Sequence, residues 1–334
     1  MRYRVSAILK SPKVLQLFFM LLLLLIIANY FRPVLSPATS ICAGVNLAGK
    51  DLGGLTTEEA KAVIEQVARM QDTPPIDCRI DPTTNGVIPG LNGLSIDVAE
   101  TLARVSSAQE HETVKPVFRQ AAPAVGLTAF PEHPIYQGNP VKQQVAFLIN
   151  VAWGNEYLPE MLAVLKEQQA EAVFFLVGRW VQANEADARL IADAGFELGN
   201  HGYSDALSMQ ELTLAAATDD ISRAAEVIEK VCGKRPVYFS PHRGELSADV
   251  LKAAASLKQR TVMWTVDTVD WMLPGVSVML DKILSKAEGG SLILMHPTAQ
   301  TPEFLRQVIP ALRTKGLEPV SLTKLLNPMR AAKE

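Results

Sequence analysis

The C-terminal part of the chain alternates between short apolar runs and segments with apolar residues at helical spacing. Gln144–Val151 is a nearly continuous apolar run, as in a buried strand, and Glu156–Gln168 carries its leucines and methionine on one helical face. Further strands are expected at 172–177, 196–200, 237–239, 261–266 and 291–295, and further helices at 185–194, 212–231 and 248–257. Repeated strand–helix units predict parallel strands joined by crossover helices, and their number favours a barrel-like closure.

The region before this pattern has a different organisation. Thr56 and Glu59 form a capping box in front of an amphipathic helix, and Asp97 is expected to begin a second helix. Proline and glycine are frequent between residues 121 and 143, which is typical of a stiff linker. We therefore expect a small α+β domain over 42–120, a linker over 121–143 and the main α/β domain over 144–328.

The most apolar segment of the chain is Val14–Phe31, and four basic residues precede it. A run of about 18 residues is the lower limit for crossing a bilayer as a helix. With the basic residues on its N-terminal side, it predicts a cytoplasmic tip and transmembrane anchor over 1–32 and an extracytoplasmic remainder. The alternative is a signal peptide cut near Ala38 and Ser40, which would give a secreted protein.

Composition and charge exclude several classes of function. The 334 residues carry a formal net charge of −3, and no basic face of the kind that binds nucleic acid is evident. No phosphate-binding loop or dinucleotide-binding glycine turn occurs, so a nucleotide partner is not expected. The three cysteines are too few for a disulfide framework or a zinc knuckle.

Polar residues follow the predicted strands at the points where the strands end. In parallel α/β folds these ends meet on one side of the sheet, where active sites form. Asp270 also follows one of these strands, and we expect the following side chains to converge on one cleft: Asn150, His201, Asp205, His242, Asp267 and His296.

In order and spacing these segments resemble the polysaccharide deacetylases, also called the NodB-homology family. The resemblance rests on Val145–Gly154, Phe174–Gly178, Gly195–His201, Asp267–Trp271 and Leu294–His296. It implies a distorted (β/α) barrel and a cell-envelope hydrolase that cleaves acetyl amide bonds, which are non-peptide carbon–nitrogen bonds, in N-acetylated glycan. The Trp153-Gly154 ending resembles a deacetylase-like group from endospore-forming bacteria, which implies a link to sporulation.

The region before the linker is similar to a small peptidoglycan-binding-like domain found before cell-wall enzymes. The similarity is carried by Gly44-Val45, Gly49, Gly53–Thr56, Glu58–Ala60, Gly93 and Ile96-Asp97. It implies peptidoglycan or another cell-wall glycan as the partner. A generic spacer that lifts the main domain off the membrane is the alternative.

The family pattern implies specific roles, and this chain departs from several of them. The family uses one aspartate as the base, a second aspartate and two histidines as ligands of a divalent metal, and a histidine paired with an aspartate as the acid. The base aligns with Asn150, which cannot accept a proton, and the ligand aspartate aligns with Val151. His201 is retained, but Asp205 stands in place of the second histidine. His296, oriented by Asp267 or Asp270, retains the acid side.

Three functions are consistent with this altered pattern. A rebuilt deacetylase would bind zinc or a similar metal through His201, Asp205 and His242. A pseudoenzyme without metal would bind glycan in the same groove, and a structural envelope component would need neither property. In the first two cases the glycan would contact Trp153, Trp271, Arg243 and Leu294. Without the family resemblance, His201 and Asp205 would be read as an ordinary hydrogen-bonded pair.

Overall fold

The computed structural model describes residue 20 and residues 40–206 and 208–330. Internal contacts divide the chain into two compact units, of which the smaller contains the chain up to Asp72 and Ser95–Arg119. The larger contains Thr73–Leu94 and everything from Gln120 onward. The stretches 73–94 and 121–143, expected in the small domain and in a linker, thus belong to the larger unit. The cause is apolar packing, because Cys78, Val87 and Ile135 lie in one buried cluster with residues of the main sheet.

The smaller unit packs two helices against a short sheet. Helix α3 (Thr57–Gln71) begins with the predicted capping box between Thr56 and Glu59, and helix α4 (Val98–Ser107) begins with Asp97 as its cap, as predicted. The sheet has the order β2-β1-β6, with bounds Lys50–Asp51, Asn46–Leu47 and Thr113–Val114. Outside this sheet, β5 (Gly93–Ile96) pairs with β7 (Phe118–Ala121), and β3 (Arg79–Ile80) pairs with β4 (Val87–Ile88) within the stretch 73–94 that belongs to the larger unit.

A curled parallel sheet forms the centre of the larger unit. Among the described residues it has eight strands in the order β12-β11-β10-β9-β8-β14-β13, with β15 paired to β8. Their bounds are β8 Gln144–Val151, β9 Ala172–Leu176, β10 Glu197–Asn200, β11 Tyr238–Phe239, β12 Arg260–Thr261, β13 Val266–Asp267, β14 Leu292–Met295 and β15 Glu318–Pro319. The strand pairings described within this sheet are all parallel, as the sequence pattern predicted.

The predicted barrel closure is only partly correct, since the sheet is a half-barrel. The single strand expected at 261–266 is instead two short strands, β12 and β13, which stand at opposite ends of the sheet order. Residues 262–265 connect these two edges covalently, and Val262 bridges to Ile135 rather than continuing a ladder. The seam between the edges is therefore spanned by the chain itself and not by paired strands.

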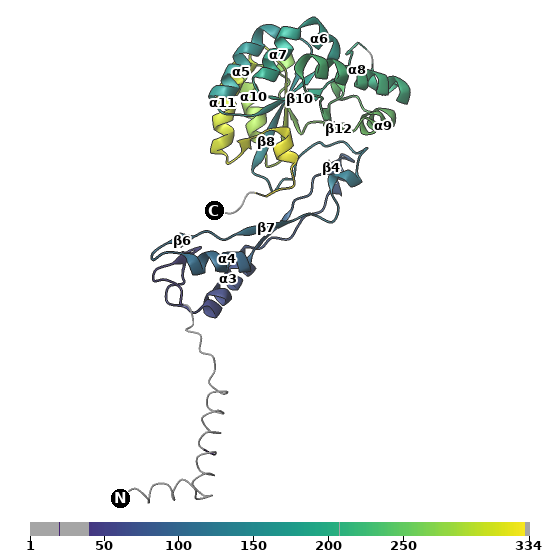
Figure 1. Cartoon of the computed structure of the whole chain (residues 1–334). Coiled ribbons are helices and arrows are strands. Elements are labelled where there is room, and N and C mark those ends of the chain that lie inside the picture. The colour runs from purple at the N-terminus through teal and green to yellow at the C-terminus, as the bar shows by residue number, and fades with distance from the viewer. Residues whose placement is uncertain (1–19, 21–39, 207, 331–334) are drawn as a thin grey trace, which may run out of the picture. The chain divides into compact units, whose positions relative to one another are not determined.

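Helices surround the sheet of the larger unit (Figure 1). The α-helices are α5 Leu158–Glu167, α6 Gly178–Ala183, α7 Glu185–Asp193, α8 Leu214–Cys232, α9 Ala248–Ser256, α10 Val276–Lys286, α11 Thr301–Thr314 and α12 Leu322–Leu326. Single 3₁₀ turns lie at η1 Leu127–Ala129, η2 Asn155–Tyr157, η3 Met209–Glu211, η4 His242–Gly244 and η5 Asp270–Met272. Helix α6 was not predicted, because it is only six residues long and has no side-chain cap.

Strand β8 shows how the sequence places one polar side chain in the site. Phe147, Ile149 and Val151 pack into the core beneath the helices, while Ala146 and Leu148 join a second buried cluster. Because side chains alternate between the two faces of a strand, Asn150 belongs to the face of Ala146 and Leu148. The last two residues of the strand, Asn150 and Val151, therefore face in opposite directions.

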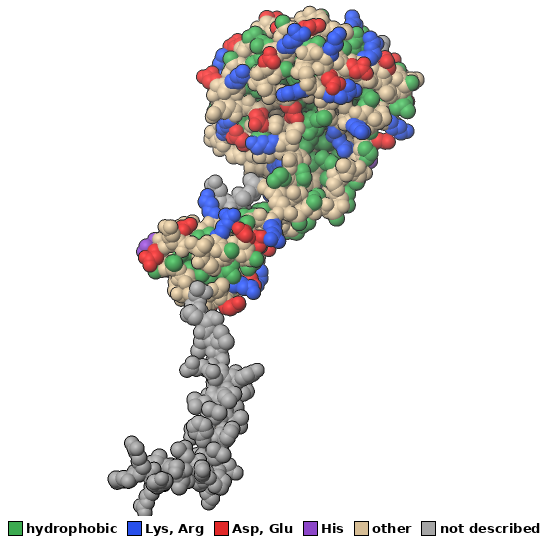
Figure 2. Space-filling model, viewed as in Figure 1, with side chains coloured by type: hydrophobic (Ala, Val, Ile, Leu, Met, Phe, Trp, Pro, Cys, Tyr) green, Lys and Arg blue, Asp and Glu red, His purple; other side chains and the backbone are tan. Residues whose placement is uncertain are grey.

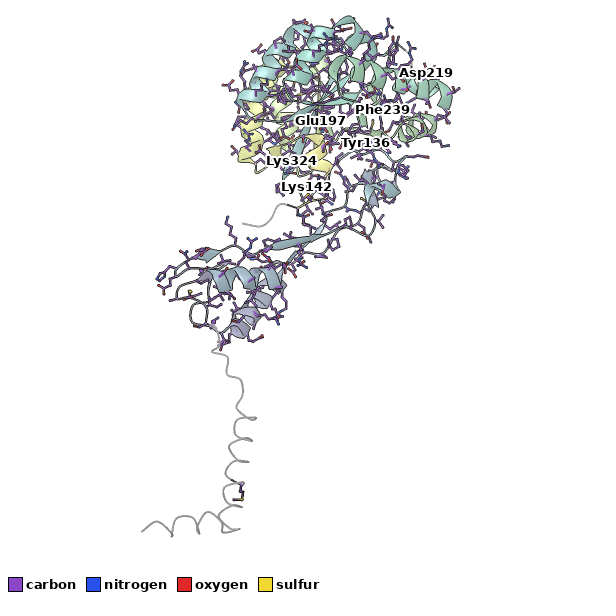
Figure 3. The ribbon with its side chains drawn as sticks, viewed as in Figure 1. Tyr136, Lys142, Glu197, Asp219, Phe239 and Lys324 are labelled. Atoms are coloured by element: carbon purple, nitrogen blue, oxygen red, sulfur yellow. The ribbon has the colours of Figure 1, made fainter. Side chains whose placement is uncertain are left out.

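The end of helix α12 is fixed by a lysine of an earlier loop. The Lys142 ammonium donates hydrogen bonds to the carbonyl oxygens of Lys324, Leu325 and Asn327, at 2.8, 2.9 and 2.5 Å. Figure 3 shows Lys142 close to Lys324. These carbonyls lack partners within the helix, so the lysine satisfies them and attaches α12 to the sheet.

The predicted membrane anchor, Val14–Phe31, lies outside the described residues apart from Met20. Within the part of the chain that the structure describes, no helix has the length and apolar character needed to cross a bilayer.

Candidate active site

A cavity of about 660 Å³ lies at the carboxyl ends of the strands. Its lining is Asn150, Ala152, Trp153, His201, Asp205, His242, Arg243, Trp264, Asp267, Trp271, Leu294 and His296. Ten of these twelve were named from the sequence as site residues, and Ala152 and Trp264 were not. Trp264 was missed because it lies inside the single strand predicted over 261–266, whereas in the structure strand β12 ends at Thr261 and Trp264 follows it.

His296 is held by a buried carboxylate. It follows strand β14, and its Nδ1 lies 2.9 Å from Oδ1 of Asp270, which is fully buried at the start of η5. The other Asp270 oxygen accepts hydrogen bonds from the His296 backbone N–H at 2.7 Å and from the Thr301 hydroxyl at 3.1 Å. Of the two candidate aspartates, Asp270 is thus the one that orients His296. Asp267 instead accepts the backbone N–H of Val269.

His201 and His242, two further residues of the lining, form a buried edge-to-face pair. Their ring centroids are 4.7 Å apart, and His201 Nδ1 lies 2.6 Å from the carbonyl oxygen of Ser240. Burial lowers the pKa of His242 to about 4, with a smaller contribution from the Arg243 charge. Burial, reinforced by His242, also lowers the pKa of His201 well below its ordinary value. Both rings are therefore neutral at pH 7.

Asn150 lines the cavity and Val151 does not. Asn150 is 5% exposed, and its Oδ1 has no hydrogen-bond partner among the described residues. Val151 is fully buried in the apolar cluster beneath the helices. The sequence resemblance implied carboxylates at both positions. Instead, position 150 places a neutral amide in the cavity, and position 151 places an apolar valine side chain in the core.

Two tryptophans form the exposed rim. The Trp153 ring stacks on His296 with 5.9 Å between centroids and 7° between planes, and it is 45% exposed. Trp271, in η5, is 56% exposed. Gly154 allows the close approach of the Trp153 loop, because a Cβ there would lie 2.0 Å from the Pro297 carbonyl oxygen. Flat exposed aromatic faces with polar neighbours suit the apolar faces of sugar rings.

The predicted metal set does not fit a metal ion. No three His, Cys, Asp or Glu side chains among the described residues approach closely enough to hold one. His201 and His242 are in ring contact, but Asp205 is exposed and Val151 supplies no donor atom. Catalytic zinc sites use three protein ligands and an open position, and the three predicted ligands do not come together into such a set.

The charges around the site are mixed. Asp205 and Asp267 are acidic, and the Arg243 guanidinium lies 3.0 Å from Glu245. On the visible face of the larger unit acidic and basic side chains alternate, without an extended area of one sign (Figure 2). Electrostatic attraction of a polyanion is therefore not a feature of this face.

Comparison with known proteins relates this fold and site to one family. The sequence profile described as polysaccharide deacetylase matches residues 137–262. The protein YlxY of Bacillus subtilis is 40% identical over 268 residues, which is 80% of this chain and 83% of that protein. A peptidoglycan-N-acetylglucosamine deacetylase of Bacillus cereus is 28% identical over 58% of this chain and 71% of its own length.

A solved structure matches most of this chain. It is that of a CE4 family pseudoenzyme from Bacillus anthracis, with a TM-score of 0.73 and 34% identity, and the match covers 81% of this chain and 96% of that one. A mutant of that protein, described as having restored enzymatic activity, matches with the same TM-score and 33% identity over 81% and 99%.

Proposed function

The chain belongs to the polysaccharide deacetylase family, and on this basis we propose that it is a catalytically impaired member that binds cell-wall glycan. The observation that carries the proposal is the pair at the end of β8. The neutral amide of Asn150 stands in the cavity where the family has its general base. Val151, at the position of a metal-ligand aspartate, is buried in the core.

Hydrolysis of an acetyl amide needs three groups. A base takes a proton from the attacking water, an electrophile polarises the carbonyl, and an acid protonates the leaving amine. The amide of Asn150 cannot serve as the base. No three-ligand metal set is present among the described residues to serve as the electrophile. Of the three required groups, the described residues retain the acid, which is the His296–Asp270 pair.

Glycan binding needs none of the lost groups. Trp153 and Trp271 are exposed aromatic residues in the lining of a cavity large enough for part of a sugar chain. The Bacillus anthracis neighbour is itself described as a pseudoenzyme, which favours this reading over a working deacetylase. The second candidate, residual deacetylation, is favoured by the intact His296–Asp270 pair alone.

The proposal includes a location outside the cytoplasm. The basic flank and apolar run at Val14–Phe31 support a membrane anchor, with secretion after cleavage as the alternative. The resemblance of the small unit to peptidoglycan-binding-like domains supports cell-wall peptidoglycan as the partner. Both features would place the cavity next to the polymer that it binds.

Two measurements on the full-length protein in detergent test the proposal. Acetate release from chitooligosaccharides and from peptidoglycan fragments should stay at the level of a protein-free control. Binding of the same fragments, followed by calorimetry, should be detectable. It should weaken by roughly tenfold in Trp271→Ala, because the apolar area that the indole buries against the sugar, at about 25 cal/mol per Å², is lost. Leu190→Ala, an exposed apolar residue of α7 outside the cavity, is the matched control and should bind as the wild type does. Robust acetate release would establish the second candidate instead.

A further inference from the structure

The loop that carries Trp153 is anchored by a hydrogen-bonded chain of three side chains. The Trp180 indole Nε1 donates to Oδ1 of Asn155 at 2.9 Å, and Nδ2 of Asn155 donates to Oδ2 of Asp187 at 2.6 Å. Asn155 is the first residue of η2, whereas Trp180 lies in α6 and Asp187 in α7. The loop after β8 is thus tied to two helices that come later in the sequence.

The chemistry of the two partners fixes which way the Asn155 amide points. An indole N–H can only donate and a carboxylate accepts, so the amide oxygen faces Trp180 and the amide nitrogen faces Asp187. Trp180 is only 6% exposed, so loss of this acceptor would leave a buried donor unpaired. Asparagine meets both requirements with one side chain. An aspartate in its place could accept from the indole, but it would put two carboxylates in contact.

The loop needs this anchor because a glycine separates Trp153 from Asn155. Gly154 has a φ of +80°, and a Cβ there would lie 2.0 Å from the Pro297 carbonyl oxygen, so a side chain would clash. Glycine also leaves the backbone freer than any other residue does. The turn is therefore fixed from its two sides, by the stacking of Trp153 on His296 and by the hydrogen bonds of Asn155.

Helix α6, in which Trp180 lies, also holds the loop that follows β10. The first two backbone N–H groups of the helix donate to the carbonyl oxygens of Gly202 and Tyr203, at 2.9 and 3.0 Å. That loop begins with His201, which lines the cavity. Helix α6 thus braces two of the loops from which the cavity is built.

We propose that Asn155 is a positioning residue for glycan binding, which acts by holding the Trp153 ring in place in the cavity lining. The inference rests on the proposed glycan binding and gives a role to a side chain outside the cavity lining. A ring that is held before the sugar arrives does not have to be ordered on binding, so more of the stacking free energy appears as affinity.

Calorimetric titration of the full-length protein in detergent with the β-1,4-linked N-acetylglucosamine tetramer tests this role. Asn155→Asp should weaken binding by about fivefold, because repulsion from Asp187 releases the loop and the sugar must then order the ring. Asp187→Asn alone should bind as the wild type does, since an amide oxygen can still accept from Asn155. Asn155→Asp combined with Asp187→Asn keeps the bond from Trp180 and reverses the bond to position 187. This exchange variant should therefore regain the wild-type affinity.

Two readouts distinguish positioning of the ring from a merely structural role. In a Trp153→Ala background, which itself binds more weakly, adding Asn155→Asp should cause no further loss of affinity. The second readout needs no glycan and uses 5-fluorotryptophan in place of the four tryptophans. The fluorine signal that is missing from Trp153→Ala should shift or broaden in Asn155→Asp and return in the exchange variant.

The outcomes separate the inference from the function on which it rests. Wild-type affinity in Asn155→Asp, an equal loss with and without the Trp153 ring, or no recovery in the exchange variant would overturn the inference and leave glycan binding in place. A wild type that binds no tetramer would remove the proposed function, and the binding role of Asn155 with it. Circular dichroism checks that each variant is folded. If Asn155→Asp does not fold, Trp180→Phe removes the same hydrogen bond from the donor side and should weaken binding only where the Trp153 ring is present.

Discussion

Restoring the family pattern should destabilise the metal-free protein, because Val151 at the end of β8 faces the core. Deacetylase activity should appear only once a metal is bound. The variant carries Asn150→Asp, Val151→Asp and Asp205→His. Val151 is fully buried and belongs to the cluster that includes Leu176 and Met295. Losing its burial costs about 1.5–3 kcal/mol, and an unpaired polar group in its place costs roughly 1–3 kcal/mol more. Without metal we expect a loss of about 4 kcal/mol, the middle of this range.

A loss of that size is readily measured. At about 2–4 °C per kcal/mol for a unit of this size, the midpoint of thermal unfolding in a chelator should fall by roughly 10 °C. If the new carboxylate turns into the cavity, it can join His201 and the new histidine as a third metal ligand. Zinc at 100 times its dissociation constant would then restore about 2.7 kcal/mol. Acetate release should appear only in the zinc-loaded triple variant.

The matched control is the double variant Asn150→Asp with Asp205→His, which retains Val151. It should lose less stability and should show no response to zinc. A triple variant that unfolds at the wild-type temperature in chelator would refute the assignment of Val151 to the core. A zinc response in the double variant would show that position 151 is not needed for a metal site.

Four further outcomes are expected. Stability should fall as the pH drops from 6.5 through 4, because the folded pKa of His242, about 4, lies below its unfolded value; urea titrations should show a loss of about 3 kcal/mol by pH 4 that is reduced in His242→Gln. Gly154→Ala should lower the melting temperature by several degrees, since its Cβ would lie 2.0 Å from the Pro297 carbonyl oxygen and φ there is +80°; Gly126→Ala, where a Cβ meets only one atom at 3.9 Å, is the control. Asp270→Asn should destabilise the fold by about 2 kcal/mol through lost charge-assisted hydrogen bonds, measured by chemical denaturation. A C-terminal reporter active only in an oxidising compartment should be active, and an inactive but well-expressed reporter would refute the topology.

Much of the fold follows from local patterns in the sequence. The capping box at Thr56 and the long apolar run of β8 each depend on residues close in the chain, so their positions were predictable. Helix α6 was missed because six residues without a cap give no periodic signal. The run 261–266 reads as one strand, but the half-barrel edge divides it into β12 and β13. That division depends on where the sheet stops, which is a tertiary property.

The sequence predicted which residues line the cavity better than it predicted where their side chains point and which partners they contact. Placement after a strand identified most of the cavity lining, since parallel strands end on one side of a sheet. The sequence did not show that Asp270 and not Asp267 holds His296, because that depends on the turn between them. Nor did it show that Val151 faces the core, although strand alternation from Asn150 was a usable signal.

The turn that presents Trp271 has a consequence for how the rim would be maintained. Val269 and Leu273 on either side of it adopt left-handed backbone conformations, with φ of 58° and 51°. Such conformations cost of order 1–3 kcal/mol each for residues other than glycine. The Asp267 carboxylate holds the Val269 N–H at 2.8 Å, which fixes the turn. The backbone that carries the exposed Trp271 is thus fixed in advance, so a sugar that stacks on the ring would not have to order the turn as well. If the rim had no function, glycine at position 269 or 273 would relieve the backbone strain and increase the stability of the fold.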